Sequence, residues 1–553
     1  MFTKRPLPKS THWRRALSNL VLAVALLVCV GGQAAFADCA CGSVDPNAPC
    51  QGNSASYTRQ SETIRFTFDC DGGACACGRF ANEHDFWVAP NSPGETVTIT
   101  RMEPDANPTG GVTGGLINGA MDDILTMESN QGFNGQIHYS SSRTVFPPYA
   151  VDPESVGRPV VLLKSISNPN ADPSNRKCNT ERMCLLYVET LTVLPGVPTE
   201  PVFRPPYFGT EKPLIPLRDF DASILPELQT TAGATSWAEA LEVVTSVNLS
   251  FISNWNVRER FHPKINTGNA SGGYPGKVAV KFNPALMKLV DQATTAPDRA
   301  DKVLLAKRIA QVGIDLYYIS KNGGGDFGGV SAEGICGAWV SNGGYGLGKL
   351  APILIASSLL GREDEWNARL NQVLSTPEGR QCFGETGTIQ PPNSAGKNVA
   401  LFGALSNDLY RVSSSNKSEA DAQGLRDASG NDASECVASY QACCTTGPML
   451  GSAMPIFLIP QVAQSFPENA AHWLEYVDRS RETGVEVGEE FGAYCSASSF
   501  AIRGYSSGYD NAVSYSLYDA YRACSRDFSC PGMNETPAPA TQRPNPPTNV
   551  IVE

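Results

Sequence analysis

The chain has 553 residues, including 17 cysteines and 5 histidines, and its formal net charge at neutral pH is −12. An acidic surface repels polyphosphates over a Debye length, so this composition disfavours nucleic acid as a partner. The length exceeds that of one ordinary domain and indicates two or three domains.

The first 37 residues have the pattern of a secretory signal peptide. Five basic residues precede an apolar stretch over 20–30, which is followed by a small-x-small sequence over 35–37. The stretch is too short to cross a bilayer as a helix, so we expect cleavage before Asp38 and no stable membrane insertion afterwards. Loss of this leader lowers the net charge by five, to −17. The sequence therefore predicts a secreted or periplasmic protein.

Sixteen cysteines remain after the leader, and this even number predicts a disulfide framework formed in an oxidising compartment. Six lie between residues 39 and 77, Cys178 and Cys184 flank a short loop, and eight lie beyond residue 330. The four remaining histidines are not spaced as metal ligands, and a Cys-x-Cys pair is not zinc spacing. We therefore expect no metal and no cofactor.

The part of the chain before residue 200 has the pattern of a β domain. Short apolar or alternating runs lie between turn-forming residues, and the clearest are Thr63–Phe68, Glu95–Thr100, 160–163 and 185–191. These runs predict β-strands, and the last two predict a hairpin that Cys178 and Cys184 are placed to close. We expect an antiparallel β-sandwich over 55–196, preceded by a Cys-rich segment over 38–54.

Helical periodicity replaces the strand pattern after a proline-rich linker over 197–215. The predicted helices are 237–255, 284–296, 298–320, 349–360, 363–374, 448–464, 469–481 and 511–524. Helices joined in part by long glycine-rich loops favour a toroid of helical hairpins over 216–530. A Pro-rich tail over 531–553 is expected to be disordered. The predicted fold class is α+β multidomain, an N-terminal antiparallel β-sandwich followed by an α-helical (α/α) toroid-like domain.

The segment from Trp339 to Lys349 holds four glycines in six residues between two predicted helices. A nucleotide-binding loop is disfavoured, because Leu350 replaces the Ser or Thr that binds magnesium and no strand precedes the segment. As a ligand loop, it presents the flat faces of Trp339 and Tyr345 to sugar rings. Asn342 and Lys349 supply hydrogen-bond donors. The simpler alternative is a tight turn with Lys349 solvated.

A second candidate segment, 254–263, gathers two guanidiniums, a carboxylate and an imidazole. Elimination from a uronic acid requires its carboxylate to be neutralised, a base for the C5 proton and an acid for the leaving oxygen. The catalytic candidates are Arg258, Arg260, His262 and Tyr345, and the substrate-binding candidates are Asn256, Tyr317, Trp339, Asn342 and Lys349. The simpler alternative is a solvated helix end with a structural histidine.

Hydrolysis would instead require two carboxyl groups placed across the scissile bond. The acidic candidates are Asp315, Asp326, Glu333, Glu489 and Glu490. Exposed acids in loops more often only solvate the surface, and the sequence does not fix the distances between them.

A family resemblance adds to these patterns. The segment 314–316, the glycine-rich loop and Lys349–Leu354 resemble secreted bacterial proteins with a β-sandwich plus helical-toroid architecture, polysaccharide-lyase-like and with a Gly-Gly-His-Gly-type loop. Residues 78–82, 86–88 and 131–134 resemble the β-domain that accompanies the toroid. The resemblance implies a polysaccharide or glycan substrate. Tyr345 stands where that pattern has His, so a catalytic role for the family's His would be altered here.

The leading interpretation is a secreted carbohydrate-active protein, polysaccharide lyase-like, that cleaves or binds an extended, uronic-acid-containing glycan. The alternatives are a glycoside hydrolase and a non-catalytic glycan-binding envelope or matrix protein. We expect the loop before the 349–360 helix and the segment 258–262 to form one wall of a groove. In that arrangement Tyr345 and Lys349 should be at least partly exposed.

Overall fold

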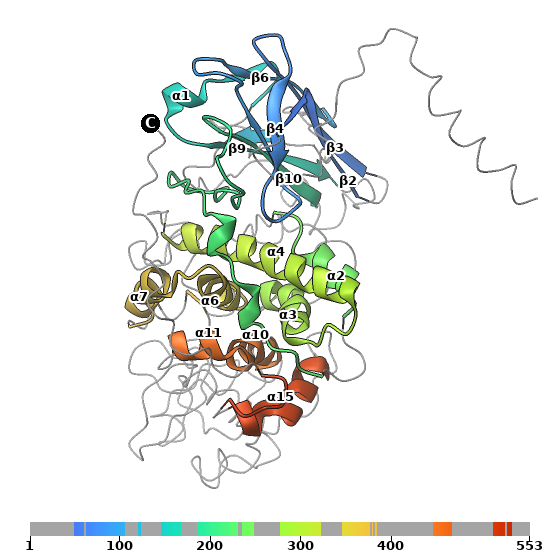
Figure 1. The fold of residues 1–553 in the computed structure, drawn as a ribbon, viewed down its shortest axis with the longest axis vertical. Coiled ribbons are helices and arrows are strands. Elements are labelled where there is room, and N and C mark those ends of the chain that lie inside the picture. The colour runs from blue at the N-terminus through green and yellow to red at the C-terminus, as the bar shows by residue number, and fades with distance from the viewer. Residues whose placement is uncertain are drawn as a thin grey trace, which may run out of the picture. The chain divides into compact units, whose positions relative to one another are not determined.

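The computed structural model describes residues 49–59, 62–105, 120–122, 145–167, 185–229, 235–247, 277–321, 346–375, 379, 382–383, 446–466, 512–525 and 528–533 (Figure 1). The chain divides into Met1–Ala37 and Asp38–Glu553, and all described residues belong to the second unit. Several predictions lie outside the described residues: the signal peptide, the Cys178 and Cys184 staple, the helix over 469–481 and nearly all of the tail.

Two sheets occupy the N-terminal part (Figure 1). The strands are β1 (Cys50–Gly52), β2 (Ser54–Arg59), β3 (Glu62–Cys70), β4 (Cys75–Arg79), β5 (Phe86–Ala89), β6 (Val97–Glu103), β7 (Ala120–Asp122), β8 (Tyr149–Val151), β9 (Val160–Ser167) and β10 (Leu185–Val193). One sheet has the order β1-β4-β5-β10-β9-β7 and the other β2-β3-β6-β8. The described pairings are antiparallel except that of β5 with β10. The predicted β9–β10 hairpin is confirmed.

The pattern along β9 shows how the larger sheet is covered. Successive side chains of a strand point to opposite faces. Leu162 and Ile166 join a core that also holds Phe66 and Phe68 of the other sheet. Val161 and Leu163 join a second core that contains the helices. The larger sheet therefore packs against the smaller sheet on one face and against helices on the other.

The helices are α1 (Pro153–Val156), α2 (Trp237–Val243), α3 (Lys277–Val290), α4 (Ala296–Lys321), α6 (Leu350–Leu359), α7 (Glu363–Leu374), α10 (Thr446–Leu458), α11 (Pro460–Ser465) and α15 (Ala512–Ser525), with 3₁₀ turns at Leu217–Asp219 and Ala222–Ile224. The predicted helices over 298–320, 349–360, 363–374 and 511–524 are confirmed. No helix within the described ranges is long and apolar enough to span a membrane.

Three predicted helix boundaries are wrong. Pro284 was expected to begin a helix, but it lies inside α3, which starts at Lys277. The helix expected over 448–464 is divided at Ile459, which has extended backbone and precedes Pro460. The helix expected to run from Trp237 to 255 ends at Val243. Proline alone does not decide a boundary: Pro460 begins α11, whereas Pro284 lies inside α3.

Disulfides join Cys70 to Cys75 and Cys524 to Cys530. Cys50, Cys77 and Cys382 are also disulfide-bonded. Disulfides persist in oxidising compartments, so these bonds agree with an extracytoplasmic location. The coarse fold class, α+β with strands before helices, is likewise confirmed.

Gly313 allows α4 and α6 to pack closely together. A Cβ atom at this position would overlap the side chain of Ala356 and the carbonyl of Pro352. We expect Gly313→Ala to lower the free energy of unfolding by about 1–3 kcal/mol, the usual cost of overpacking, although alanine favours helices more than glycine does. Urea denaturation measures this change.

Gly196→Ala is the matched control, because nothing lies within 4 Å of a Cβ atom built there. That variant should stay within about 0.5 kcal/mol of the wild type. If Gly313→Ala proved as stable as Gly196→Ala, the close contact between α4 and α6 would be incorrect.

Candidate functional site at the junction of the sheets and the helices

The segment over 201–216, called here the junction strap, connects the sheets to the helices and is mostly buried. Phe203, Tyr207 and Phe208 are fully enclosed, and they belong to the core that contains the helices. The backbone N–H of Phe203 donates to the carbonyl of Ile215, which folds the strap back on itself. The sequence identified this region by its prolines as a linker, and the structure shows that it is also part of the core.

Arg204 in the junction strap binds two carboxylates that come from different parts of the fold. Its Nε donates to Asp85 Oδ2 at 2.6 Å, and its Nη2 donates to Asp315 Oδ2 at 2.6 Å. Its Nη1 donates to Asp315 Oδ1 and to the carbonyl of Pro205. Asp85 precedes β5 and Asp315 lies in α4, so one guanidinium connects a sheet, the strap and a helix. We call these three side chains the inner cluster.

The inner cluster is an ion network without access to solvent. Arg204 has only 1% of its surface exposed. Burial disfavours its charge, but Asp315 and Asp85 raise the pKa of Arg204 above its ordinary value. Burial also opposes ionisation of Asp85, yet the charge of Arg204 and the surrounding donors hold the pKa of that carboxyl below its ordinary value. Buried charges that are paired in this way are suited to holding the fold together rather than to binding a substrate.

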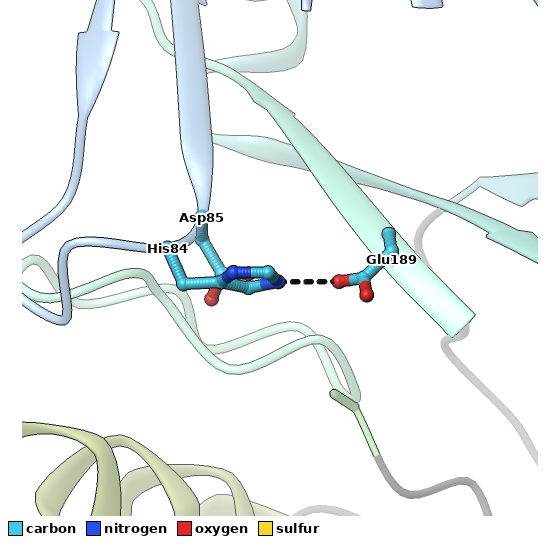
Figure 2. A group of neighbouring side chains, drawn as sticks. All are labelled: His84, Asp85 and Glu189. Atoms are coloured by element: carbon cyan, nitrogen blue, oxygen red, sulfur yellow. Dashed lines mark hydrogen bonds and ion pairs between the residues drawn. The ribbon is translucent and has the colours of Figure 1, made fainter. Parts of the chain in front are cut away.

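A second group of side chains, the outer cluster, lies beside the inner one and consists of His84, Glu189, Arg59 and Arg308. Figure 2 shows His84 and Glu189 reaching toward each other, with Asp85 adjacent to His84. His84 Nε2 and Glu189 Oε2 are 2.7 Å apart. The carboxylate on β10 is buried, whereas 13% of the His84 side chain is exposed. The outer cluster therefore reaches the surface.

The two arginines of the outer cluster lie close together. Arg59 Nε is 3.3 Å from Glu189 Oε1, and a further nitrogen of Arg59 donates to the hydroxyl of Ser246. Arg308 Nη1 donates to the hydroxyl of Thr245 at 2.6 Å. Burial and the charge of Arg59 lower the pKa of Arg308 below its ordinary value. Two guanidiniums thus share one region between the sheets and the helices.

The inner cluster fixes the backbone that carries the outer one. Asp85 follows His84 directly, and Thr190 follows Glu189. The hydroxyl of Thr190 donates to Asp85 Oδ1 at 3.3 Å, while Arg204 holds the other oxygen of the same carboxylate. Asn82 also donates to Asp85 Oδ2, at 2.8 Å. The two partners of the histidine–carboxylate pair are therefore held in place through their neighbours in the chain.

His84, Asp85 and Glu189 offer ligand atoms that lie within 4.8 Å of one another, and these residue types bind divalent cations. However, Arg204 pairs with Asp85, and Arg59 pairs with Glu189. Two guanidiniums thus neutralise the two carboxylates and would repel a cation placed between them. The charges favour a hydrogen-bonded ion network over a metal centre.

The predicted site residues fall mostly outside the described residues: Asn256, Arg258, Arg260, His262, Trp339, Asn342 and Tyr345. Tyr317 is described and buried, and its ring stacks on Trp366 with centroids 4.2 Å apart. Its hydroxyl donates to Glu365 Oε1 at 3.5 Å. In this position Tyr317 packs within the helical core.

Lys349 is also described, and the exposure expected for it is wrong. Only 2% of its surface is exposed. The glycine-rich turn ends directly at α6, in which every residue is buried, so the side chain just before the helix is enclosed as well. Burial lowers the pKa of Lys349 to about 7.

The hydrolase candidate Asp315 is likewise enclosed, because both of its oxygens bind Arg204.

Sequence reasoning missed the outer cluster. His84 and Glu189 are 105 residues apart, and no local motif connects them. One signal was available, because Glu189 is an acidic residue inside the apolar run of β10. A charge in a predicted buried strand requires a partner.

No protein-family model, curated protein or solved structure matches this chain. The resemblance to lyase-like secreted proteins therefore stays an expectation. Function has to be argued from the chemistry of the site.

Proposed function

We propose that this is an exported carbohydrate-active protein that binds an extended acidic glycan at the junction of the sheets and the helices and cleaves it by a lyase-like elimination. The observation that carries the proposal is the position of Arg59 and Arg308, which donate to the hydroxyls of the consecutive residues Ser246 and Thr245. Guanidinium groups match the planar carboxylate of a uronic acid. Arg59 already faces the carboxylates of Glu189 and Glu242, so in our proposal a bound carboxylate shares its guanidinium with them.

The chain connectivity supports this location. Thr245 and Ser246, which bond Arg308 and Arg59, lie at the start of the stretch that continues into 248–276. That stretch carries the predicted residues Asn256, Arg258, Arg260 and His262. In our proposal these side chains extend the same anion site, with the arginines and the amide on the carboxylate of the glycan.

The glycine-rich segment follows α4 in the sequence. Arg308 lies in α4, and the stretch 322–345 with Trp339, Asn342 and Tyr345 follows the end of this helix. In our proposal its aromatic rings stack on sugars next to the anion site. We also propose that the two sheets form a β-sandwich, which their shared core supports, and that the helices form an (α/α) toroid.

The function is tested by incubating the mature protein with a panel of uronic-acid and neutral glycans. We expect unsaturated products, followed by their absorbance, from at least one acidic glycan. New reducing ends on neutral glycans would indicate a glycoside hydrolase instead of a lyase. Binding on a glycan array without any product would leave a non-catalytic glycan-binding protein. No binding to any glycan would reject the proposal.

Arg260→Ala tests the anion site. Hydrogen bonds to charged groups contribute about 1.5–3 kcal/mol, so the variant should bind an acidic oligosaccharide roughly 10- to 100-fold more weakly. Binding of neutral oligosaccharides should not change. Isothermal titration calorimetry measures both. Arg101→Ala is the control, because Arg101 lies on β6 with 60% of its side chain exposed and pairs with Glu103. Equal weakening for acidic and neutral sugars would contradict a carboxylate contact.

A further inference from the structure

The histidine–carboxylate pair of the outer cluster has the geometry of a proton-transfer site. Glu189 is 1% exposed, and its Oε2 lies 2.7 Å from Nε2 of His84. A carboxylate that accepts a hydrogen bond from one ring nitrogen fixes the orientation and the tautomer of the imidazole. The neutral ring then carries its proton on Nε2 and its lone pair on Nδ1.

Nδ1 is the nitrogen left for a ligand. Among the described residues, no hydrogen bond involves Nδ1 of His84, and part of this side chain is exposed. Besides Glu189, the groups near the ring include Asp85, Tyr57, whose ring centroid is 4.9 Å away, and Arg79, which donates to the carbonyl of His84. An imidazole with one nitrogen held by a buried carboxylate and the other without a hydrogen bond among the described residues is arranged as a general base.

One nitrogen of the neighbouring arginine lacks an acceptor, whereas the other two face Ser246, Glu189 and Glu242. Nη2 of Arg59 is buried and has no hydrogen-bond partner within the described part of the chain. A buried donor without a partner costs about 1–3 kcal/mol, and an oxygen of a bound carboxylate would supply the acceptor. Arg308 lies close to Arg59 and is partly exposed. The outer cluster thus combines a base with groups that stabilise negative charge.

We infer that His84, oriented by Glu189, transfers the proton in the elimination, with the uronate carboxylate bound by Arg59 and Arg308. The inference rests on the proposed function. Nδ1 takes the C5 proton, the C5–H electrons form the C4=C5 double bond, and the C4–O bond breaks. The imidazolium returns the proton to the leaving oxygen. The arginines stabilise the charge that develops on the carboxylate. The step consumes no water and no oxidant.

The first test compares His84→Gln with Glu83→Gln. Glu83 is an exposed neighbour that pairs with Lys307 and does not bond the imidazole. For the acidic glycan that the wild type cleaves, His84→Gln should lose about 10²- to 10⁴-fold in kcat, the usual contribution of a general base. Its affinity for the glycan should change less than about threefold, and Glu83→Gln should match the wild type on both measures.

Two further measurements separate chemistry from structure. Added imidazole should restore part of the rate of His84→Ala, which a structural role would not produce. Glu189→Gln keeps an oxygen that accepts from Nε2 but removes the negative charge that stabilises the imidazolium formed during proton transfer, so kcat should fall while the affinity for the glycan is kept. All rates are compared per folded molecule, with folding checked by circular dichroism.

The outcomes test the role of His84 and the proposed function separately. If the wild type cleaves an acidic glycan and His84→Gln keeps its kcat within threefold, the role of His84 is overturned and the proposed function stands. If the wild type binds oligogalacturonate or oligoglucuronate without cleaving it, proton transfer is overturned and glycan binding stands. If it binds neither, both ideas fail.

Discussion

Arg204→Met should lower the free energy of unfolding by about 3–5 kcal/mol, the largest stability loss we expect from a single substitution in this protein. The guanidinium is buried and bonds Asp85 and Asp315, each at 2.6 Å. Methionine fills similar space but leaves both carboxylates buried without their cation, and an unpaired buried charge is costly. Chemical denaturation with the disulfides intact measures the loss.

The triple variant Arg204→Met, Asp85→Asn, Asp315→Asn separates lost charge pairing from lost packing. It removes both orphaned carboxylates, so it should recover part of the stability that the single variant loses. Arg218→Met is the control, because Arg218 is 56% exposed and its ion pair with Glu200 should contribute no more than about 1 kcal/mol. A single variant as stable as this control would show that Arg204 does not hold the junction together.

The inner cluster also bears on function, because it places the outer cluster. Asp85 receives hydrogen bonds from Arg204 and Thr190, and these bonds fix the residues next to His84 and Glu189. A shift of about 1 Å in a catalytic group is enough to reduce rates by about 10²-fold. Loss of Arg204 should therefore impair turnover even in molecules that remain folded.

Local signals in the sequence predicted much of the secondary structure. Glu363 to Leu374 forms α7 with three acidic residues in its first turn, as the helix dipole favours. The alternation in Thr63–Phe68 correctly predicted β3. Pro284 failed as a helix start, because α3 continues through it and buries Phe282 and Leu286 on either side. Packing of an apolar face outweighs the local preference of one proline.

The sites could not be predicted to the same extent, because their contacts are distant in sequence. Arg204 lies 119 residues from Asp85 and 111 from Asp315. The sequence emphasised compact motifs such as 254–263, whose charges are neighbours along the chain. It gave no measure of burial for single charged residues, so Lys349 was expected at the surface. The structure encloses Lys349, and it brings His84, whose side chain is 13% exposed, next to Glu189.

Lys349→Met should remove part of the pH dependence of stability. Burial lowers the pKa of Lys349 to about 7, and its place at the start of α6 adds the positive end of the helix dipole. In the unfolded chain a lysine titrates near 10.4. Between these values the unfolded state binds a proton that the folded state does not. Stability should therefore rise with pH by up to about 1.4 kcal/mol per unit from this group.

The measurement compares wild type and Lys349→Met by chemical denaturation at about pH 7.5 and about pH 9.5. The difference in unfolding free energy, wild type minus variant, should increase by about 2.5 kcal/mol over this interval. Lys164, whose pKa burial also lowers to about 7, contributes equally to both proteins and cancels. Lys321→Met, at a surface ion pair with Glu211, should follow the wild type at both pH values. If the unfolding free energies of wild type and Lys349→Met changed equally with pH, the ammonium group would be solvated. Lys349 would then again be a candidate ligand contact of the segment from Trp339 to Lys349.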